Sequence, residues 1–197
     1  MTNLRLLAIA ALIPLAACAS APAIAQAQVD VAAFDAIDLR GGGHVTVRHG
    51  VRQRVTLLRG DLATSRIEVG SRRGNERSLV IEACRTSCSD YDLRVEIVTP
   101  DIGAVAVTGG GEIEFESGFA AQRALALSVT GGGSIDARAV PAQDVAASVR
   151  GGGSIQTEPR NALAASVSGG GAIVYSGNPM VTSSVQGGGA VTRGRSR

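Results

Sequence analysis

Hydrophobic and polar residues alternate along most of this chain, and three consecutive glycines interrupt the alternation at regular intervals. Five such triplets stand in one frame between hydrophobic runs, and they begin at Gly109, Gly131, Gly151, Gly169 and Gly187. The intervals between them are 22, 20, 18 and 18 residues. Strict alternation predicts β-strands with one buried face, and a repeat of about 20 residues is typical of a chain that coils into a solenoid.

The alternation also predicts which side chains point inward in each coil. The predicted inner residues are aliphatic, and they are Leu125, Leu127, Val129, Ile135 and Ala137, then Val145, Ala147, Val149 and Ile155, then Leu163, Ala165, Val167 and Ile173. The last coil weakens at Ser183 and Arg193, which predicts an end cap or a fraying edge. On the outer face, serines are expected in register at Ser128, Ser148, Ser166 and Ser184, beside Thr130, Arg150, Ser168 and Gln186.

The glycines are predicted to form the corners of the coils. A sharp turn that lies against the backbone of the next coil favours glycine, which adopts positive φ and has no Cβ. The predicted structural turns are Gly109, Gly110, Gly111, Gly131, Gly132, Gly133, Gly151, Gly152, Gly153, Gly169, Gly170, Gly171, Gly187, Gly188 and Gly189. Valine at Gly132 or Gly152 is therefore expected to disrupt a corner.

The N-terminal part repeats the strand–glycine–strand pattern once, around Gly41, Gly42 and Gly43. The 68 residues from Gly41 to Gly109 are expected to hold about three irregular coils. No segment after residue 28 has a helical period, so we predict an all-β fold, a single-stranded right-handed β-helix (β-solenoid) with less regular N-terminal coils. The predicted divisions are a signal peptide and tether at 1–28, the solenoid at 29–191 and a basic tail at 192–197.

The first residues have the pattern of an export signal. Arg5 is followed by an apolar run at residues 6–15, which is too short to span a bilayer. The sequence LAAC ending at Cys18 is similar to a bacterial lipobox, in which Cys18 would be acylated as a lipid anchor. A-x-A sequences within residues 23–27 would instead release a soluble protein. The expected location is the periplasm or the outer membrane and cell surface.

Composition narrows the functions further. Aromatic residues make up 3% of the 197 residues, Trp is absent and the net charge is +2, so nucleic-acid binding is not expected. Outside the cytoplasm, Cys84 and Cys88 are predicted to form a disulfide. His44 and His49 are the only histidines, and their odd spacing places them on opposite faces of a strand. No metal site and no cofactor are predicted.

Several of these features, in this order, resemble the putative auto-transporter adhesin head (GIN domain) family. They are FDAIDL at residues 34–39 before a glycine turn, LRVEIV at 93–98 ending at Pro100, and the glycine-rich repeats. The resemblance covers roughly residues 34–191. It implies an exported bacterial β-helical protein, often with a lipoprotein signal, and by its name it implies adhesion.

We therefore predict a non-catalytic cell-envelope protein with an adhesive or structural role. Its predicted partners are an unidentified envelope or surface ligand, the membrane through the lipid anchor, and a second copy through the end of the solenoid.

The alternative is an envelope enzyme that acts on glycans. Glu112, Glu114 and Glu116 alternate on one outward face, with Asp136 expected one coil from Glu114, and paired carboxylates can serve as acid and base. Later coils place Gln156, Val174 and Thr192 at the equivalent position, which favours a solvated acidic edge.

Overall fold

The computed structural model describes residues 27–71, 77–84 and 92–194. These residues form fifteen β-strands and no helix, so the prediction of an all-β fold is confirmed. The strands are β1 (Ala27–Val29), β2 (Ala36–Gly41), β3 (His44–His49), β4 (Arg54–Arg59), β5 (Arg66–Ser71), β6 (Arg77–Glu82), β7 (Arg94–Thr99), β8 (Ala104–Gly109), β9 (Glu112–Phe115), β10 (Gln122–Gly131), β11 (Ser134–Gly151), β12 (Ser154–Ser168), β13 (Ala172–Tyr175), β14 (Met180–Gln186) and β15 (Ala190–Arg193).

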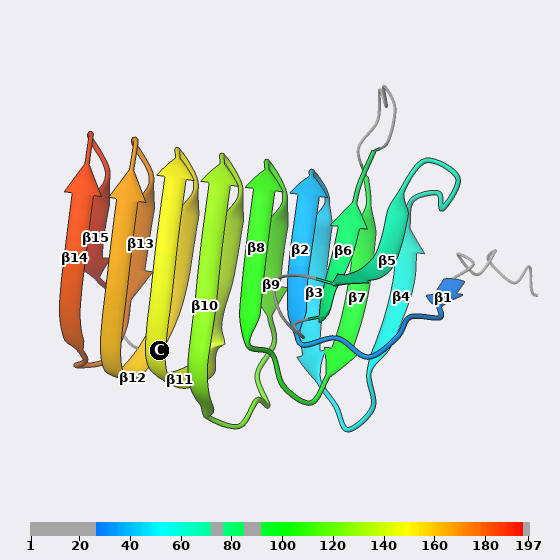
Figure 1. The fold of residues 1–197 in the computed structure, drawn as a ribbon, viewed down its shortest axis with the longest axis horizontal. Coiled ribbons are helices and arrows are strands. Elements are labelled where there is room, and N and C mark those ends of the chain that lie inside the picture. The colour runs from blue at the N-terminus through cyan, green and yellow to red at the C-terminus, as the bar shows by residue number, and fades with distance from the viewer. Residues whose placement is uncertain (1–26, 72–76, 85–91, 195–197) are drawn as a thin grey trace, which may run out of the picture.

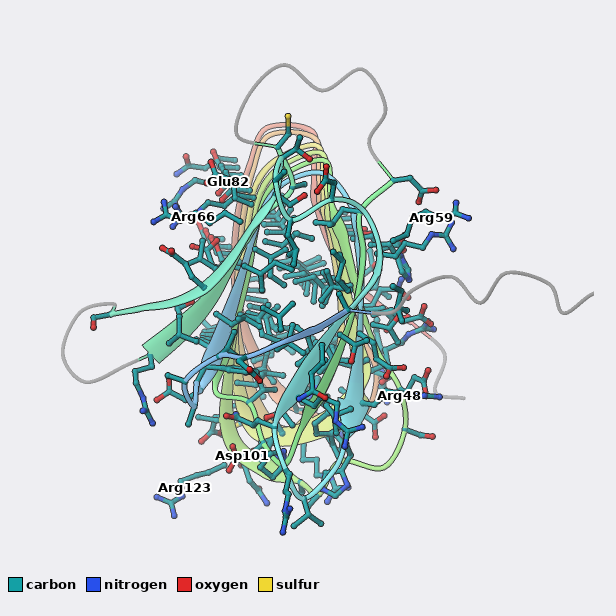
Figure 2. The ribbon with its side chains drawn as sticks, turned by 90° about the vertical axis from the view of Figure 1, so that its right-hand side faces the viewer. Arg48, Arg59, Arg66, Glu82, Asp101 and Arg123 are labelled. Atoms are coloured by element: carbon teal, nitrogen blue, oxygen red, sulfur yellow. The ribbon has the colours of Figure 1, made fainter. Side chains whose placement is uncertain are left out.

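The strands lie in two rows that face each other across a narrow core (Figures 1 and 2). A repeat crosses from one row to the other at its glycine triplet, and parallel pairing joins each repeat to the next in register. The long strands β11 and β12 contribute to both rows, and their mutual pairing shifts register between Ala137 and Asp144. The chain therefore bends back to the first row there while it stays paired with its neighbour.

The predicted inner faces are buried. Val129, Val149 and Ile155 have no exposed side-chain surface, and the other aliphatic residues predicted to point inward from Leu125 to Ile173 are at most 5% exposed. Parallel in-register pairing places identical or similar side chains above one another, as for Val129, Val149 and Val167. These ladders of small aliphatic side chains fill a core that needs no large aromatic residue.

The first and third glycines of each triplet touch the preceding corner. Gly151 has φ +116°, and a Cβ there would lie 2.6 Å from the carbonyl oxygen of Gly131. A Cβ on Gly153 would lie 2.4 Å from the oxygen of Gly133 and 2.5 Å from Cγ1 of Val129. The corners also hydrogen-bond one another, since Gly152 N–H and Gly153 N–H both donate to the Gly131 carbonyl, at 3.0 and 2.9 Å.

The middle glycine does not share this constraint. A Cβ on Gly110, Gly132, Gly152, Gly170 or Gly188 would have no atom within 4 Å, and none of these residues has positive φ. Valine at Gly132 or Gly152 is expected from the sequence to disrupt a corner. This expectation is wrong on steric grounds, because a side chain on the middle residue would point away from the neighbouring coil.

The N-terminal part departs from the expected order of coils. β2 and β3 pair directly with β8 and β9, so Gly41 lies against Gly109 although 68 residues separate them. The segment between them folds to the other side of β2 and β3. There β6 pairs in parallel with β2, and β7 pairs in parallel with β3. β4, β5 and β1 then run antiparallel at that end of the stack. The intervening residues therefore do not form three coils stacked between Gly41 and Gly109.

Corner chemistry explains this arrangement. A Cβ on Gly109 would lie 2.3 Å from the Gly41 carbonyl oxygen, so this close contact requires a glycine corner. Stacking one glycine triplet directly on another satisfies that requirement, whatever the sequence distance between them. Antiparallel strands need no crossover, so they can cover the remaining end.

Candidate binding face

One outward face of the stack consists mainly of alanine and serine. It lies on β8, β10, the C-terminal part of β11, β12 and β14, where strand pairing aligns two columns of side chains. The first column is Ala104, Ala126, Ala146, Ala164 and Thr182, and the second is Ala106, Ser128, Ser148, Ser166 and Ser184. The predicted register of the serines is confirmed. We call these ten residues the alanine–serine face.

An open hollow of about 490 Å³ lies on this face. Its outward lining comes from Ala126, Ala146, Ala164 and Thr182, and from the serines Ser148, Ser166 and Ser184. The alanine side chains end at Cβ, and the adjacent column also contains two alanines, Ala124 and Ala162, beside Asp144 and Met180. Short side chains therefore form the floor of the hollow.

Charged groups border this face at its N-terminal side. Asp38 on β2 aligns with Ala106 on β8 and is only 7% exposed. Arg40 donates a hydrogen bond to it at 2.7 Å, and this hydrogen bond raises the pKa of the Arg40 guanidinium above its ordinary value. The buried carboxylate thus has its counter-charge two residues away on the same strand.

The opposite outward face is rich in ion pairs. Arg48 on β3 donates to Glu116 at 2.8 Å and to Glu96 on β7 at 3.1 Å, and the hydrogen bond to Glu116 is the main reason that the pKa of Arg48 is raised. His44 Nδ1 lies 3.4 Å from Glu112 Oε2. The two faces therefore differ in chemistry from β8 onward. At the N-terminal end both sides carry charged side chains, and Figure 2 shows Arg48 and Arg59 on one side and Arg66 and Glu82 on the other.

The residues of the glycan-acting alternative lie on the charged face. Glu114 on β9 pairs in register with Asp136 on β11, as the sequence predicts, and the next positions are Gln156, Val174 and Thr192. Arg138 donates to Asp136, and this hydrogen bond raises the pKa of Arg138. The described residues contain no group of three or more His, Cys, Asp and Glu side chains with the geometry of a metal site.

The remaining predicted residues lie mostly outside the described ranges. This applies to Cys18 and the whole export segment, and also to Cys88. Cys84 takes part in a disulfide, and its pairing with Cys88 stays a prediction. Within the described ranges, no helix has the length and apolar character required to cross a bilayer.

Two features were not predicted from the sequence. The alanine column stands two residues before each serine, in the recurring sequences LALS, VAAS and LAAS, and it could have been found by extending the same alternation outward. The second feature is an aromatic cluster, in which Phe119 contacts Phe115 and His49 edge-to-face, with ring centroids 5.7 and 5.5 Å apart. Phe119 lies in a connection between strands, so no periodicity indicated its burial.

Comparison with known proteins agrees with this fold. A putative adhesin from Bacteroides fragilis has a similar structure, with 17% sequence identity and a TM-score of 0.53 over 85% of this chain and 95% of that chain. A putative cell adhesion protein from Clostridium sporogenes is more distant, with 10% identity and a TM-score of 0.40 over 85% and 97% of the two chains. No curated protein sequence gave a significant match.

A family model described as "Putative auto-transporter adhesin, head GIN domain" matches residues 33–125 and 120–179. The match includes the first glycine corner, the aromatic cluster and most of the alanine–serine face. It covers more than half of the chain. This chain therefore belongs to the auto-transporter adhesin head (GIN domain) family.

Proposed function

We propose that this chain is a non-catalytic protein of the bacterial cell envelope that binds an envelope or surface partner through the alanine–serine face. The family description and the Bacteroides fragilis neighbour both name adhesins, which supports an adhesive role. The observation that carries the proposal is the uncharged, regularly spaced face with its open hollow of about 490 Å³.

The physical argument rests on the cost of binding. Burying a charged group against a partner costs free energy unless a counter-charge is supplied, and alanine and serine columns impose no such cost. These short side chains also lose little conformational entropy when a partner orders them. Parallel coils spaced by about 4.8 Å would present the same groups repeatedly, which suits a partner that is itself flat or repetitive.

Export fits the same proposal. Residues 1–28 would direct the chain out of the cytoplasm, with acylation of Cys18 as the anchor, and a disulfide at Cys84 suits an oxidising compartment. The fold between β8 and β15 would be a right-handed β-solenoid of one strand pair per coil.

The glycan-acting alternative has weaker support. Glu112 and Glu116 on its proposed edge contact His44 and Arg48. Arg138 binds Asp136, the register neighbour of Glu114. Carboxylates with basic partners of this kind serve as ion pairs on a sheet surface, whereas general acid catalysis favours a carboxyl group with a raised pKa.

Adherence of protein-coated beads to bacterial and host cell surfaces tests the proposal. Ala146→Arg and Ala164→Arg place long charged side chains in the hollow and should abolish adherence without unfolding the protein, because both positions are exposed. Gln156→Arg, at the same depth in the stack on the opposite face, is the matched control and should adhere normally. Adherence of Ala146→Arg and Ala164→Arg at the wild-type level would contradict a role for the alanine–serine face.

Location can be tested separately with intact cells. Protease added to whole cells should digest the domain if it is displayed on the surface, and membrane fractionation with a Cys18→Ala variant tests the anchor. Protection until the outer membrane is broken would place the protein in the periplasm and would favour a structural role over adhesion.

A further inference from the structure

The two ends of the stack are built differently. At the N-terminal end, β1 and β4 extend one row antiparallel and β5 extends the other, as Figure 1 shows. At the C-terminal end, β14 pairs only with β12 and β15 only with β13 among the described strands. In the described part of the chain, the last coil therefore presents the free edges of two strands and an end of the core that no further strand covers.

The exposed edge of β14 is uncharged and carries exposed apolar side chains. Val181 and Val185 occupy inward positions of the strand but are 37% and 42% exposed, and Met180 is 73% exposed. The seven residues of β14 include no charged residue and no proline. Native edge strands normally use charges, prolines or bulges to prevent pairing with another chain, and this strand lacks the first two.

We propose that β14 pairs with β14 of a second copy, antiparallel, about a two-fold axis at Ser183. This register places Val181 opposite Val185 of the second copy and Thr182 opposite Ser184 of the second copy. Inward residues then meet inward residues, so the two hydrophobic cores become continuous. Outward hydroxyl groups meet outward hydroxyl groups in the same way, which makes the strand complementary to itself.

The difference between the ends selects a closed dimer over a filament. A filament needs the free edge to bind the opposite end of the next molecule, where β4 and β5 present Arg54, Arg59 and Arg66. A two-fold interface needs only the one edge, used twice.

Arg193 limits the affinity of this dimer. Ser183 and Arg193 each stand five residues from Gly188, so they lie at about the same height on the two rows. The two-fold axis at Ser183 therefore brings the Arg193 side chains of the two copies toward each other. Like charges facing each other across a sheet weaken pairing, so the dimer should tighten when salt screens them or when Arg193 is removed.

Cysteine cross-linking tests the register. Residues directly opposite in antiparallel strands have Cα atoms about 4.5–5.5 Å apart, a distance that a disulfide can span. Ser183→Cys should therefore give a disulfide-linked dimer on mild oxidation, identified by mass spectrometry of the linked peptide. Thr182→Cys is the control, because its equivalent in the second copy is displaced along the strand. No more cross-linking for Ser183→Cys than for Thr182→Cys would overturn the proposed register.

Sedimentation equilibrium of the exported protein, up to about 1 mM, tests the association itself. The wild type should form a dimer reversibly, Val185→Lys should remain monomeric and folded by circular dichroism, and Arg193→Ser should tighten the dimer about two- to fivefold. Ser166→Lys, an outward position on the paired strand β12, should leave the dimer unchanged. The proposal is wrong if the wild type and Arg193→Ser both stay monomeric, if Val185→Lys still dimerises, or if open-ended oligomers form.

Discussion

The three glycines of a corner should respond differently to alanine. We consider Gly151→Ala, Gly152→Ala and Gly153→Ala, three single-methyl changes at consecutive residues of one corner. A Cβ at Gly153 would meet the Gly133 carbonyl oxygen at 2.4 Å and one at Gly151 would meet the Gly131 oxygen at 2.6 Å, while one at Gly152 would meet nothing within 4 Å. Composition is identical in the three variants, so the difference between them reports the corner geometry alone.

The magnitudes follow from these contacts. At Gly153, overlap with backbone that cannot move freely should cost about 3 kcal/mol, the upper part of the range for overpacking. At Gly151, φ of +116° adds about 1–2 kcal/mol of conformational strain to a similar overlap. Gly152→Ala should be neutral or up to about 1 kcal/mol stabilising, because alanine restricts only the unfolded chain there.

Urea unfolding followed by circular dichroism measures all three variants. Gly152→Ala should keep the midpoint of the parent protein, whereas Gly151→Ala and Gly153→Ala should lower it with an unchanged m-value. In thermal unfolding a loss of 3 kcal/mol corresponds to a midpoint lower by roughly 6–12 °C for a protein of this size. Equal destabilisation by Gly152→Ala and Gly153→Ala would refute the assignment of separate roles to the glycines.

Three further predictions concern the core and the ion pairs. Thr157 is fully buried and its hydroxyl has no hydrogen-bond partner among the described residues, so Thr157→Val should raise the free energy of unfolding by about 1 kcal/mol in urea titrations; a loss of stability would mean that the hydroxyl is satisfied. Phe119→Ala should cost about 3–5 kcal/mol and Phe119→Leu about 1 kcal/mol, because leucine keeps most of the buried volume and loses mainly the edge-to-face contacts; equal losses would contradict a contribution from buried volume. Hydrogen bonds from Arg59 and, to a smaller extent, Arg94 hold the pKa of Asp92 below its ordinary value of 3.8. The ionised Asp92 carboxylate therefore stabilises the folded protein at pH values above 3.8. This stabilisation is lost as the pH falls through the lower pKa of the folded state. Asp92→Asn should therefore flatten the fall of stability with pH in acid, and an unchanged slope between the two proteins would contradict this.

Alternation made the repetitive half of the molecule predictable. Every residue that alternation predicts to point inward from Leu125 to Ile173 is buried, because a shift by one place would move a whole strand face into water. The predicted set does not include Val140, Ala142 and Thr157, which are also fully buried. The position of Asp136 beside Glu114 follows from the same register. The sequence also indicates where regularity ends, since Ser183 and Arg193 interrupt the inner face at the coil that has no further neighbour among the described strands.

The N-terminal half was less predictable for a physical reason. Alternation identifies strands but not their partners, and β2 is compatible with a neighbour on either side. Its position against β8 depends on the contact between Gly41 and Gly109. A glycine count alone could not predict this contact, because the middle residue of each triplet does not take part in it. The three glycines of a triplet are identical in sequence, but the first and third make close contacts and the middle one makes none.

The corner also explains why the fold constrains the outward columns so little. Contacts between Gly131, Gly151 and Gly169 set the spacing and register of adjacent coils through the backbone. The inner ladder needs aliphatic side chains at every second position, but an outward residue meets only its register neighbours and water. Position 150 can therefore be arginine where positions 130 and 168 are threonine and serine. Where outward residues nevertheless stay small and uncharged over several coils, as on the alanine–serine face, the corner and the core supply no reason for it, whereas the proposed binding of a partner would explain it.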